Sequence, residues 1–435
     1  MKLSSILVGA CSIFALSGIA YAETITIATV NNGDMIRMQK LTDDFSAKNP
    51  GIELEWVTLE ENILRQRVTT DIATNGGQFD VLTIGTYEVP IWANQGWLVP
   101  LTALQNDPVY DSDDLLPAIA GGLSVDGKLY AAPFYGESSM VMYRKDLMEK
   151  AGLVMPDAPS WDFIANAARK MTNRDEGING ICLRGKAGWG ENMGFITAAA
   201  NSFGARWFDE DWTAQFDQPA WKNTLEFYVK LMNDAGPVGA SSNGFNENLT
   251  LFQQGKCGMW VDATVAASFV TSKDSTVADK VGFALAPDNG LGKRANWLWA
   301  WSLAIPASSQ KQDAAVEFVS WATDKAYLEL VASKEGWAAV PPGTRTSLYK
   351  NPKYLAAAPF AQMTLDSINA ADPKNPTVDP VPYVGVQFVA IPEYQGIGNS
   401  VGQQFSAALA GTKSVDEALA EAQNITKREM KAAGY

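Results

Sequence analysis

Hydrophobic and polar positions follow two different periods at the start of the chain. Residues 24–30 and 52–57 alternate with the two-residue period of a strand, and residues 79–84 form a short apolar run. Between them, apolar positions in residues 35–45 and 63–73 recur at helical spacing. The order strand–helix–strand–helix–strand predicts a parallel sheet with right-handed crossovers.

The carboxyl ends of these strands are the expected place for a ligand. They fall at residues 31–34, 58–62 and 85–87. Residues 31–34, Asn-Asn-Gly-Asp, are also expected to form a turn and helix cap before the first helix. The sequence therefore directs attention to Asn32, Thr86 and Tyr87.

A second α/β region begins near residue 133. Helices are predicted over residues 161–171, 219–232 and 313–332, followed by a terminal amphipathic helix; Ser160 and Ser414 are expected to cap the first and the last of these. Strands are predicted over residues 180–183, 281–286 and 296–306, and in the second half of the stretch 252–262, which begins as the end of a helix. The chain length suits two domains better than one core.

The first 22 residues resemble a secretory signal peptide. Lys2 precedes an apolar stretch over residues 3–19, and Ala20-Tyr21-Ala22 has the small-x-small form of a cleavage site. We expect cleavage after Ala22 and a periplasmic location. A membrane anchor is disfavoured because the stretch is short and contains serines, and a lipoprotein at Cys11 because almost no apolar region precedes that residue.

Charge and composition exclude several classes of function. The net charge is −14, which disfavours nucleic acid and anionic membranes as partners. The chain has no histidine, so it lacks the commonest general base and the commonest metal ligand. No spaced Cys/Asp/Glu cluster replaces it, and we expect no metal and no cofactor.

Two cysteines, Cys182 and Cys257, follow the signal peptide. In an oxidising periplasm they could form a disulfide. They could equally be two separate buried thiols, and the sequence leaves both alternatives open.

Tryptophans are the clearest candidates for binding a neutral solute. Trp297, Trp299 and Trp301 alternate along one predicted strand, so their side chains share a face. An indole offers a ligand both apolar area and an N–H hydrogen-bond donor. Trp260 and Asp262 show the same spacing. Burial in the core is the competing interpretation for each of these indoles.

Three stretches resemble the maltose-binding-protein-like family of extracellular solute-binding proteins of ABC importers. They are DGKLYAAPFY at 126–135 with MYRKDL at 142–147, FQQGKCGMW at 252–260, and VDEAL at 415–419. Their order and spacing extend over almost the whole chain after the signal peptide. Within the family the chain is most similar to sorbitol- and mannitol-binding proteins, through residues 29–37 and 79–98.

The resemblance implies an α/β fold of two lobes with a ligand cleft between them and hinge closure on binding. It places the N-terminal lobe at residues 23–133 plus 306–345 and the C-terminal lobe at residues 134–305 plus 346–435. It implies a sugar alcohol or sugar as ligand, the permease and ATPase of an importer as partners, a monomer, and no enzymatic activity.

The resemblance also supports some site residues. Tyr135 and Glu137 follow the crossover proline, Arg65 lies on the helix after the second strand, and Arg345 lies near the predicted hinge. Position 85, often acidic in the family, is glycine here, which shifts attention to its neighbours. The predicted ligand-binding residues are Asn32, Arg65, Thr86, Tyr87, Tyr135, Glu137, Trp260, Asp262, Trp297, Trp299, Trp301 and Arg345.

The alternative function is a secreted glycoside hydrolase. It would require two carboxylates about 5 to 9 Å apart across a cleft, and Glu137 with Asp262 is the candidate pair. No hydrolase motif is recognisable. An amino-acid or peptide ligand is also compatible with the fold, since a fold does not fix its ligand.

Overall fold

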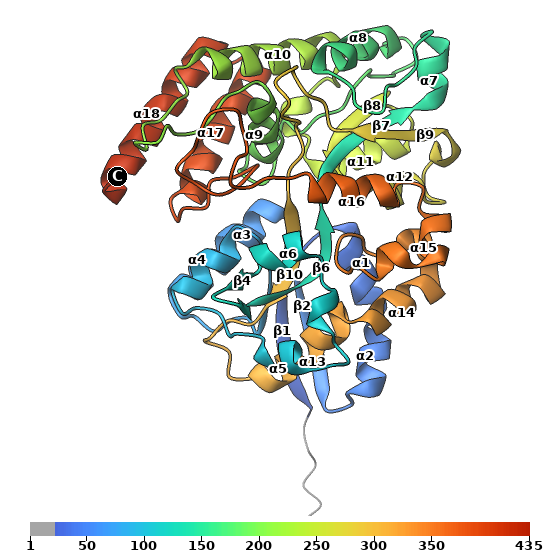
Figure 1. Cartoon of the computed structure of the whole chain (residues 1–435), viewed down its shortest axis with the longest axis vertical. Coiled ribbons are helices and arrows are strands. Elements are labelled where there is room, and N and C mark those ends of the chain that lie inside the picture. Colours follow the sequence, from blue (N-terminus) through green and yellow to red (C-terminus); the bar gives the residue numbers. More distant parts are fainter. Residues whose placement is uncertain (1–21) are drawn as a thin grey trace, which may run out of the picture.

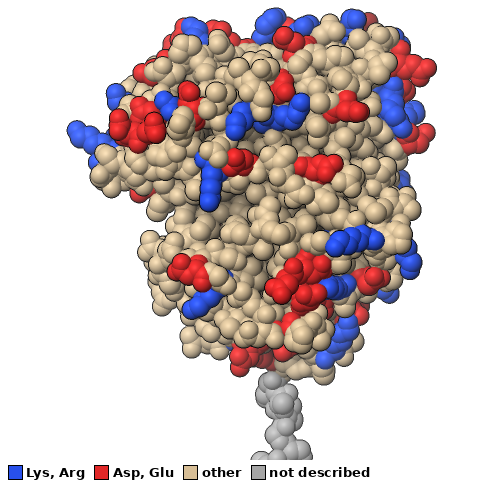
Figure 2. Space-filling model, viewed as in Figure 1, with Lys and Arg blue, Asp and Glu red and all other residues tan. Residues whose placement is uncertain are grey.

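The computed structural model describes residues 22–435 and shows two α/β lobes that meet along a groove (Figures 1 and 2). The predicted signal peptide, apart from Ala22, lies outside the described residues. Within residues 22–435, no helix is long and apolar enough to cross a membrane. The two-lobed α/β fold expected from the sequence is confirmed.

The first lobe is built on a five-stranded sheet with the order β2-β1-β3-β10-β6. Its strands are β1 (Glu23–Val30), β2 (Ile52–Leu59), β3 (Val81–Gly85), β6 (Ala131–Glu137) and β10 (Trp299–Ala304). The predicted parallel arrangement of the first three strands is confirmed, whereas β10 runs antiparallel to both of its neighbours.

Helices and a short hairpin surround this sheet (Figure 1). They are α1 (Gly33–Lys40), α2 (Thr42–Lys48), α3 (Glu61–Ala73), α4 (Glu88–Asn94), α5 (Thr102–Asn106), α6 (Pro117–Gly122), α13 (Gln312–Thr323), α14 (Lys325–Glu335), α15 (Pro352–Ala357), β4 (Ser124–Val125) and β5 (Lys128–Leu129).

The second lobe contains a three-stranded antiparallel sheet with the order β8-β7-β9. Its elements are β7 (Ser139–Arg144), β8 (Met259–Ala263), β9 (Val281–Leu285), α7 (Lys145–Lys150), α8 (Trp161–Met171), α9 (Asn192–Ser202), α10 (Pro219–Ala235), α11 (Phe245–Gln253), α12 (Ala266–Val270), α16 (Ala361–Asn369), α17 (Tyr394–Leu409) and α18 (Val415–Ala433). Ser160 and Ser414 cap α8 and α18 as predicted.

Strand pairing moves two predicted lobe boundaries, and α15 moves a third, because it was predicted in the C-terminal lobe but packs against Trp337, which follows α14 of the first lobe. Residues 134–137 and 299–304, which we had placed in the C-terminal lobe, belong to the sheet of the first lobe, where Trp301 pairs with Gly85 on one side and Tyr135 on the other. The sequence could not decide this, because an apolar strand fits the buried middle of either sheet. Only Ser138 separates β6 from β7, so the chain passes directly from one sheet to the other.

Two predicted elements are different in the structure. The single helix expected over 313–332 is two helices, because Asp324 leaves the helical conformation and its side chain caps α14 by accepting a hydrogen bond from Tyr327 N (2.6 Å). The strand expected over 180–183 is present only as single bridges to the segment around Cys257 and Trp260.

Candidate ligand-binding cleft

A cavity with a volume of ≈ 90 Å³ lies between the lobes. It is lined from the first lobe by the ends of β1 and β2, the start of α3, and the facing ends of β6 and β10. From the second lobe it is lined mainly by the segment 184–195 and the start of α11. The lining residues are Val30, Asn31, Asn32, Glu60, Glu61, Arg65, Tyr135, Glu137, Arg184, Lys186, Trp189, Gly190, Glu191, Gly194, Phe195, Phe245, Asn246, Glu247, Ala263, Val265, Trp297, Trp299, Trp301 and Gln387.

Asn32 has both the structural and the cavity-lining position that the sequence predicted. Its carboxamide oxygen accepts from Met35 N (2.9 Å) and so caps α1. Its Nδ2 donates to Tyr135 Oη (3.1 Å) from β6. The cap therefore fixes the amide, and the amide in turn orients the phenol beside it.

Arg65 is a fixed cation in the wall of the cavity. Its guanidinium pairs with Glu61 (2.8 Å) and with Glu88 (2.5 Å), and lies 3.9 Å from the ring centre of Trp189. Burial opposes its charge, but the two carboxylates outweigh burial and raise the pKa of Arg65. The rings of Trp299 and Trp301 also lie close to the same guanidinium group. Arg65 can therefore donate hydrogen bonds without moving.

All three alternating indoles reach the cavity. Trp297, Trp299 and Trp301 line it, and Trp189 from the second lobe packs edge-on against Trp299 (5.8 Å between ring centres). A side chain at Gly85 would overlap the six-membered ring of Trp299. The glycine that departs from the family pattern therefore makes the space in which this indole lies.

Arg184 is the matching cation of the second lobe. Its guanidinium forms two hydrogen bonds to Asp262 (2.9 and 2.6 Å), a geometry that fixes the plane of the fork. Trp260 Nε1 donates to the same carboxylate (2.9 Å). Asp262 and Trp260 are fully buried and lie behind Arg184, which alone of the three lines the cavity.

Two acidic side chains in the cavity are difficult to ionise. Burial raises the pKa of Glu137 well above its usual value, and nearby Asp262 and Glu61 oppose the favourable effect of Arg184. Burial and Glu61 also raise the pKa of Glu191 to about 7, although Arg184 and Lys186 lower it. One carboxylate oxygen of each is buried without a hydrogen-bond partner among the described residues. These oxygens are available to a hydroxyl-bearing ligand.

Seven of the predicted site residues line the cavity and five do not. Those that line it are Asn32, Arg65, Tyr135, Glu137, Trp297, Trp299 and Trp301; those that do not are Thr86, Tyr87, Trp260, Asp262 and Arg345. For the second group the expected cavity position is wrong.

The physical reasons differ among these five. Tyr87 lies behind the cavity wall, where its hydroxyl donates to Ile391 O (3.0 Å) and its ring packs on Trp189. Thr86 is buried against Gly122. Arg345 is fully buried and donates to the carbonyls of Asp111 (2.9 Å) and Thr323 (3.0 Å), which is a structural role.

Trp260 and Asp262 form a support for Arg184 rather than a surface for the ligand. The indole of Trp260 packs between Phe245 and Phe252. The two-residue spacing correctly indicated a shared face, but that face is covered by Phe245 and Phe252 of α11 and by the guanidinium of Arg184.

Sequence reasoning missed several cavity residues. They are Glu60, Glu61, Arg184, Lys186, Trp189, Glu191, Phe245, Asn246, Glu247 and Gln387. Glu60 and Glu61 lie within the strand end predicted at 58–62, and Arg184 directly follows the predicted strand 180–183, so those three carried a signal. Gln387 carried none, since it comes from an irregular segment far along the chain.

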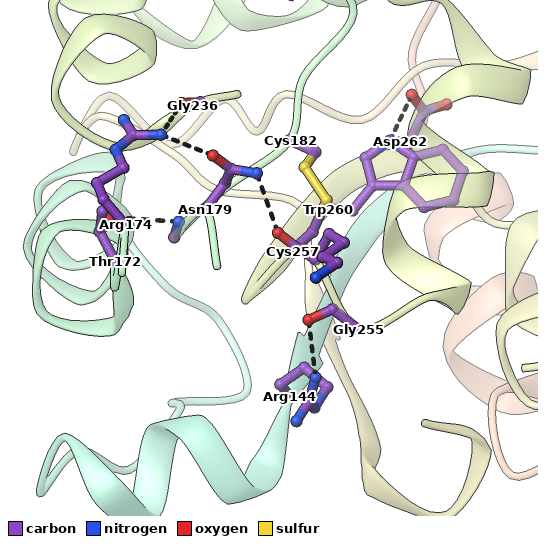
Figure 3. The surroundings of a disulfide bond; sticks show 12 residues. Arg144, Thr172, Arg174, Asn179, Cys182, Gly236, Gly255, Cys257, Trp260 and Asp262 are labelled. Carbon is purple, nitrogen blue, oxygen red and sulfur yellow. Dashed lines mark hydrogen bonds between the residues drawn. A yellow bond between two sulfur atoms is a disulfide. The ribbon is translucent and has the colours of Figure 1, made fainter. Parts of the chain in front are cut away.

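Cys182 and Cys257 form a disulfide with 5.9 Å between their Cα atoms (Figure 3). This decides between the two alternatives that the sequence left open. The bond joins the segment before Arg184 to the segment before β8, so it lies close in the chain to both Arg184 and Asp262. Among residues 22–435, no group of three or more His, Cys, Asp or Glu side chains could hold a metal ion.

Comparison with known proteins gives the family. Residues 32–329 match the family described as bacterial extracellular solute-binding protein. The chain belongs to this family. The resemblance noted in the sequence is thereby confirmed.

Two relatives are similar over nearly the whole chain. A mannitol-binding protein of Pseudomonas aeruginosa is 60% identical over 415 residues, which is 95% of this chain and 94% of the relative. An ABC transporter solute-binding protein of Agrobacterium vitis, crystallised with bound D-mannitol, is 73% identical, with a TM-score of 0.95 over 95% of this chain and 100% of the other. A ribitol complex from Agrobacterium radiobacter shares the fold at 23% identity, with a TM-score of 0.83 over 94% and 99% of the two chains.

Proposed function

We propose that this solute-binding protein captures a hexitol, D-mannitol foremost, and delivers it to the permease and ATPase of a bacterial ABC importer. The observation that carries the proposal is the wall of four indoles facing two fixed guanidinium groups and two carboxyls inside one interlobe cavity. The similarity to mannitol-binding relatives supports the same solute.

The chemistry of the cavity suits an uncharged, hydroxyl-rich chain. Arg65 and Arg184 donate hydrogen bonds, while the free oxygens of Glu137 and Glu191 exchange them with hydroxyls. Indole faces pack against the C–H groups of the carbon chain. Both guanidinium groups are paired within the protein, so a neutral solute leaves neither cation uncompensated.

The hydrolase alternative loses its candidate carboxylate pair. Asp262 is fully buried and bonded to Arg184 and Trp260, so it does not face Glu137 across the cavity. We propose that the protein returns its solute chemically unchanged. Chromatography of a mannitol or glycoside solution after prolonged incubation tests this, and any new product would contradict it.

We further propose that the protein acts in the periplasm after cleavage at Ala22. The support is the leader-like sequence of residues 1–22 and the membership of an extracellular family. The intact mass of protein recovered from the periplasm should correspond to a chain that starts at Glu23. A mass that includes the leader would contradict the proposal.

Calorimetric titration tests the solute. We expect D-mannitol to bind with a dissociation constant near micromolar, about −8 kcal/mol, and an amino acid to give no heat. Sorbitol and ribitol measure the discrimination between polyols. Heat with an amino acid and none with any polyol would overturn the proposal.

A pair of tryptophan variants locates the binding site. Trp299→Ala removes an indole from the cavity and should weaken mannitol binding by about 2 to 4 kcal/mol. Trp337→Ala is the matched control, because Trp337 is only partly buried and does not line the cavity. Equal effects of both substitutions would place the solute elsewhere.

A further inference from the structure

The segment from Lys186 to Glu191 of the second lobe lies directly against the start of α3 in the first lobe. Asn62 Nδ2 donates to Ala187 O (3.1 Å), and Lys186 pairs with Glu60. Trp189 covers the guanidinium of Arg65. This segment, here called the clasp, therefore connects the two lobes at the edge of the cavity.

The clasp is held firmly on its own lobe. Trp189 N donates to Asn399 Oδ1 (2.9 Å) on α17, and Asn192 Nδ2 donates to Gly402 O (2.8 Å) on the same helix. Side chains at Gly398 and Gly402 would collide with the clasp, so α17 presents bare backbone to it. Because the clasp is fixed to α17, it approaches α3 only when the whole second lobe does.

Two glycines of the clasp face the first lobe at very short range. A Cβ atom at Gly188 would overlap Asn62 Oδ1, and one at Gly190 would overlap Glu61 Oε1 and lie 3.1 Å from Arg65 Nε. Asn62 cannot swing away freely, since its amide is bonded to Ala187 O. Each position therefore admits hydrogen but not a methyl group at the present separation of the lobes.

We propose that Gly188 and Gly190 determine solute affinity by setting how closely the lobes approach, although neither has a side chain to touch the solute. A methyl group at either position penalises the state in which the clasp meets α3. At Gly188, whose φ is +159°, a side chain also strains the backbone of the clasp itself. Apparent affinity falls with the population of the binding-competent state. The inference rests on the proposed binding of D-mannitol.

The test uses Gly188→Ala in the full-length mature protein, with D-mannitol as the titrated solute. We expect the dissociation constant to rise about tenfold or more. The melting temperature without solute measures the separate effect of backbone strain at Gly188. Gly396→Ala is the matched control, because Gly396 is an exposed position on α17 with open space around it, and its affinity should equal that of the wild type.

A double variant identifies the clash. Asn62→Ala removes the atom that the new methyl group would meet, so Gly188→Ala combined with Asn62→Ala should bind no more weakly than Asn62→Ala alone. Additive losses would assign the effect to strain at Gly188 and overturn the proposal. An affinity of Gly188→Ala within twofold of the wild type would overturn it as well. A wild-type protein that fails to bind mannitol would overturn the proposed solute together with this inference, whereas normal wild-type binding with unaffected variants would overturn the inference alone.

Discussion

Arg65 and Arg184 show how single residues build this site. Each guanidinium reaches the cavity from one lobe and is fixed by a carboxylate that does not line it, Glu88 for Arg65 and Asp262 for Arg184. A fixed donor loses little freedom when a hydroxyl binds to it. The buried acids are thus part of the site without touching the ligand, which is why sequence patterns assigned Asp262 to the cavity.

Trp260 is expected to contribute stability rather than affinity. Replacing it by alanine should lower the free energy of unfolding by about 3 to 5 kcal/mol, because the indole is fully buried between two phenylalanines. Denaturant unfolding and mannitol titration of one preparation measure both quantities. A variant as stable as the wild type but with strongly reduced affinity would indicate that Trp260 contacts the solute.

Glu191 should make stability depend on pH. Its pKa is raised from the ordinary 4.5 to about 7, so the fold favours the protonated carboxyl. The stabilisation is full below about pH 4.5 and is lost as the pH rises through about 7. Melting temperatures from pH 5 to 8 should therefore fall less in Glu191→Gln than in the wild type. The slope does not vanish, because the pKa of Glu137 is raised as well. Identical slopes would contradict the assignment.

At the scale of elements, the segment leading to Arg184 depends on few contacts. It forms single bridges to the β8 region, through Asn179 with Cys257 and Cys182 with Trp260, and Cys182 N donates to Met259 O (2.9 Å). The disulfide adds a covalent tie at the same place (Figure 3). An irregular segment that carries a site residue is thereby held like a strand.

Replacing both cysteines by serine should lower the free energy of unfolding by roughly 4 kcal/mol. The bond closes a long loop, with a sequence separation of 75, and so restricts the unfolded chain. Thermal unfolding of the double variant beside the wild type measures the loss. Thiol titration of the denatured, unreduced mature protein should find no free thiol, and two free thiols would contradict the bond.

At the scale of the whole molecule, the lobes contact each other directly at and around the cavity. Asn246 Nδ2 donates to Asn31 O (3.0 Å), and Phe269 of the second lobe lies against Gly33 of the first. With the clasp, these contacts favour approach of the lobes. Solute affinity therefore includes a contribution from protein–protein contacts across the groove (Figure 2).

Lys186→Gln tests the charged part of this contribution. The ion pair with Glu60 is partly exposed, so its loss should weaken mannitol binding only about two- to fivefold. High salt should weaken the wild type in the same way and affect the variant less. Lys230→Gln, which removes an exposed pair with Asp234 within α10, is the control and should leave affinity unchanged. A variant with the wild-type salt dependence would contradict a role for the pair.

The sequence by itself determined the local elements and the class of site. Two alternating runs and one short apolar run predicted β1 to β3 and their parallel pairing. A turn and helix cap was predicted over residues 31–34, where Asn32 caps α1, and the spacing of Trp297, Trp299 and Trp301 correctly predicted a shared face. These features depend on neighbours within a few residues, and strand and helix periods encode such relations directly.

Only the tertiary structure decided which faces meet the cleft. Trp260 and Trp299 have the same spacing pattern, yet Trp260 is covered by Phe245 and Phe252 of α11, whereas Trp299 fits beside Gly85 in the cavity wall. Three features depend on residues far apart in the chain: the pairing of β10 with the sheet of the first lobe, the ion pair of Arg184 with Asp262, and the contact of the clasp with α3. Local periodicity states which side chains lie together on an element, but the packing of distant elements determines what covers them.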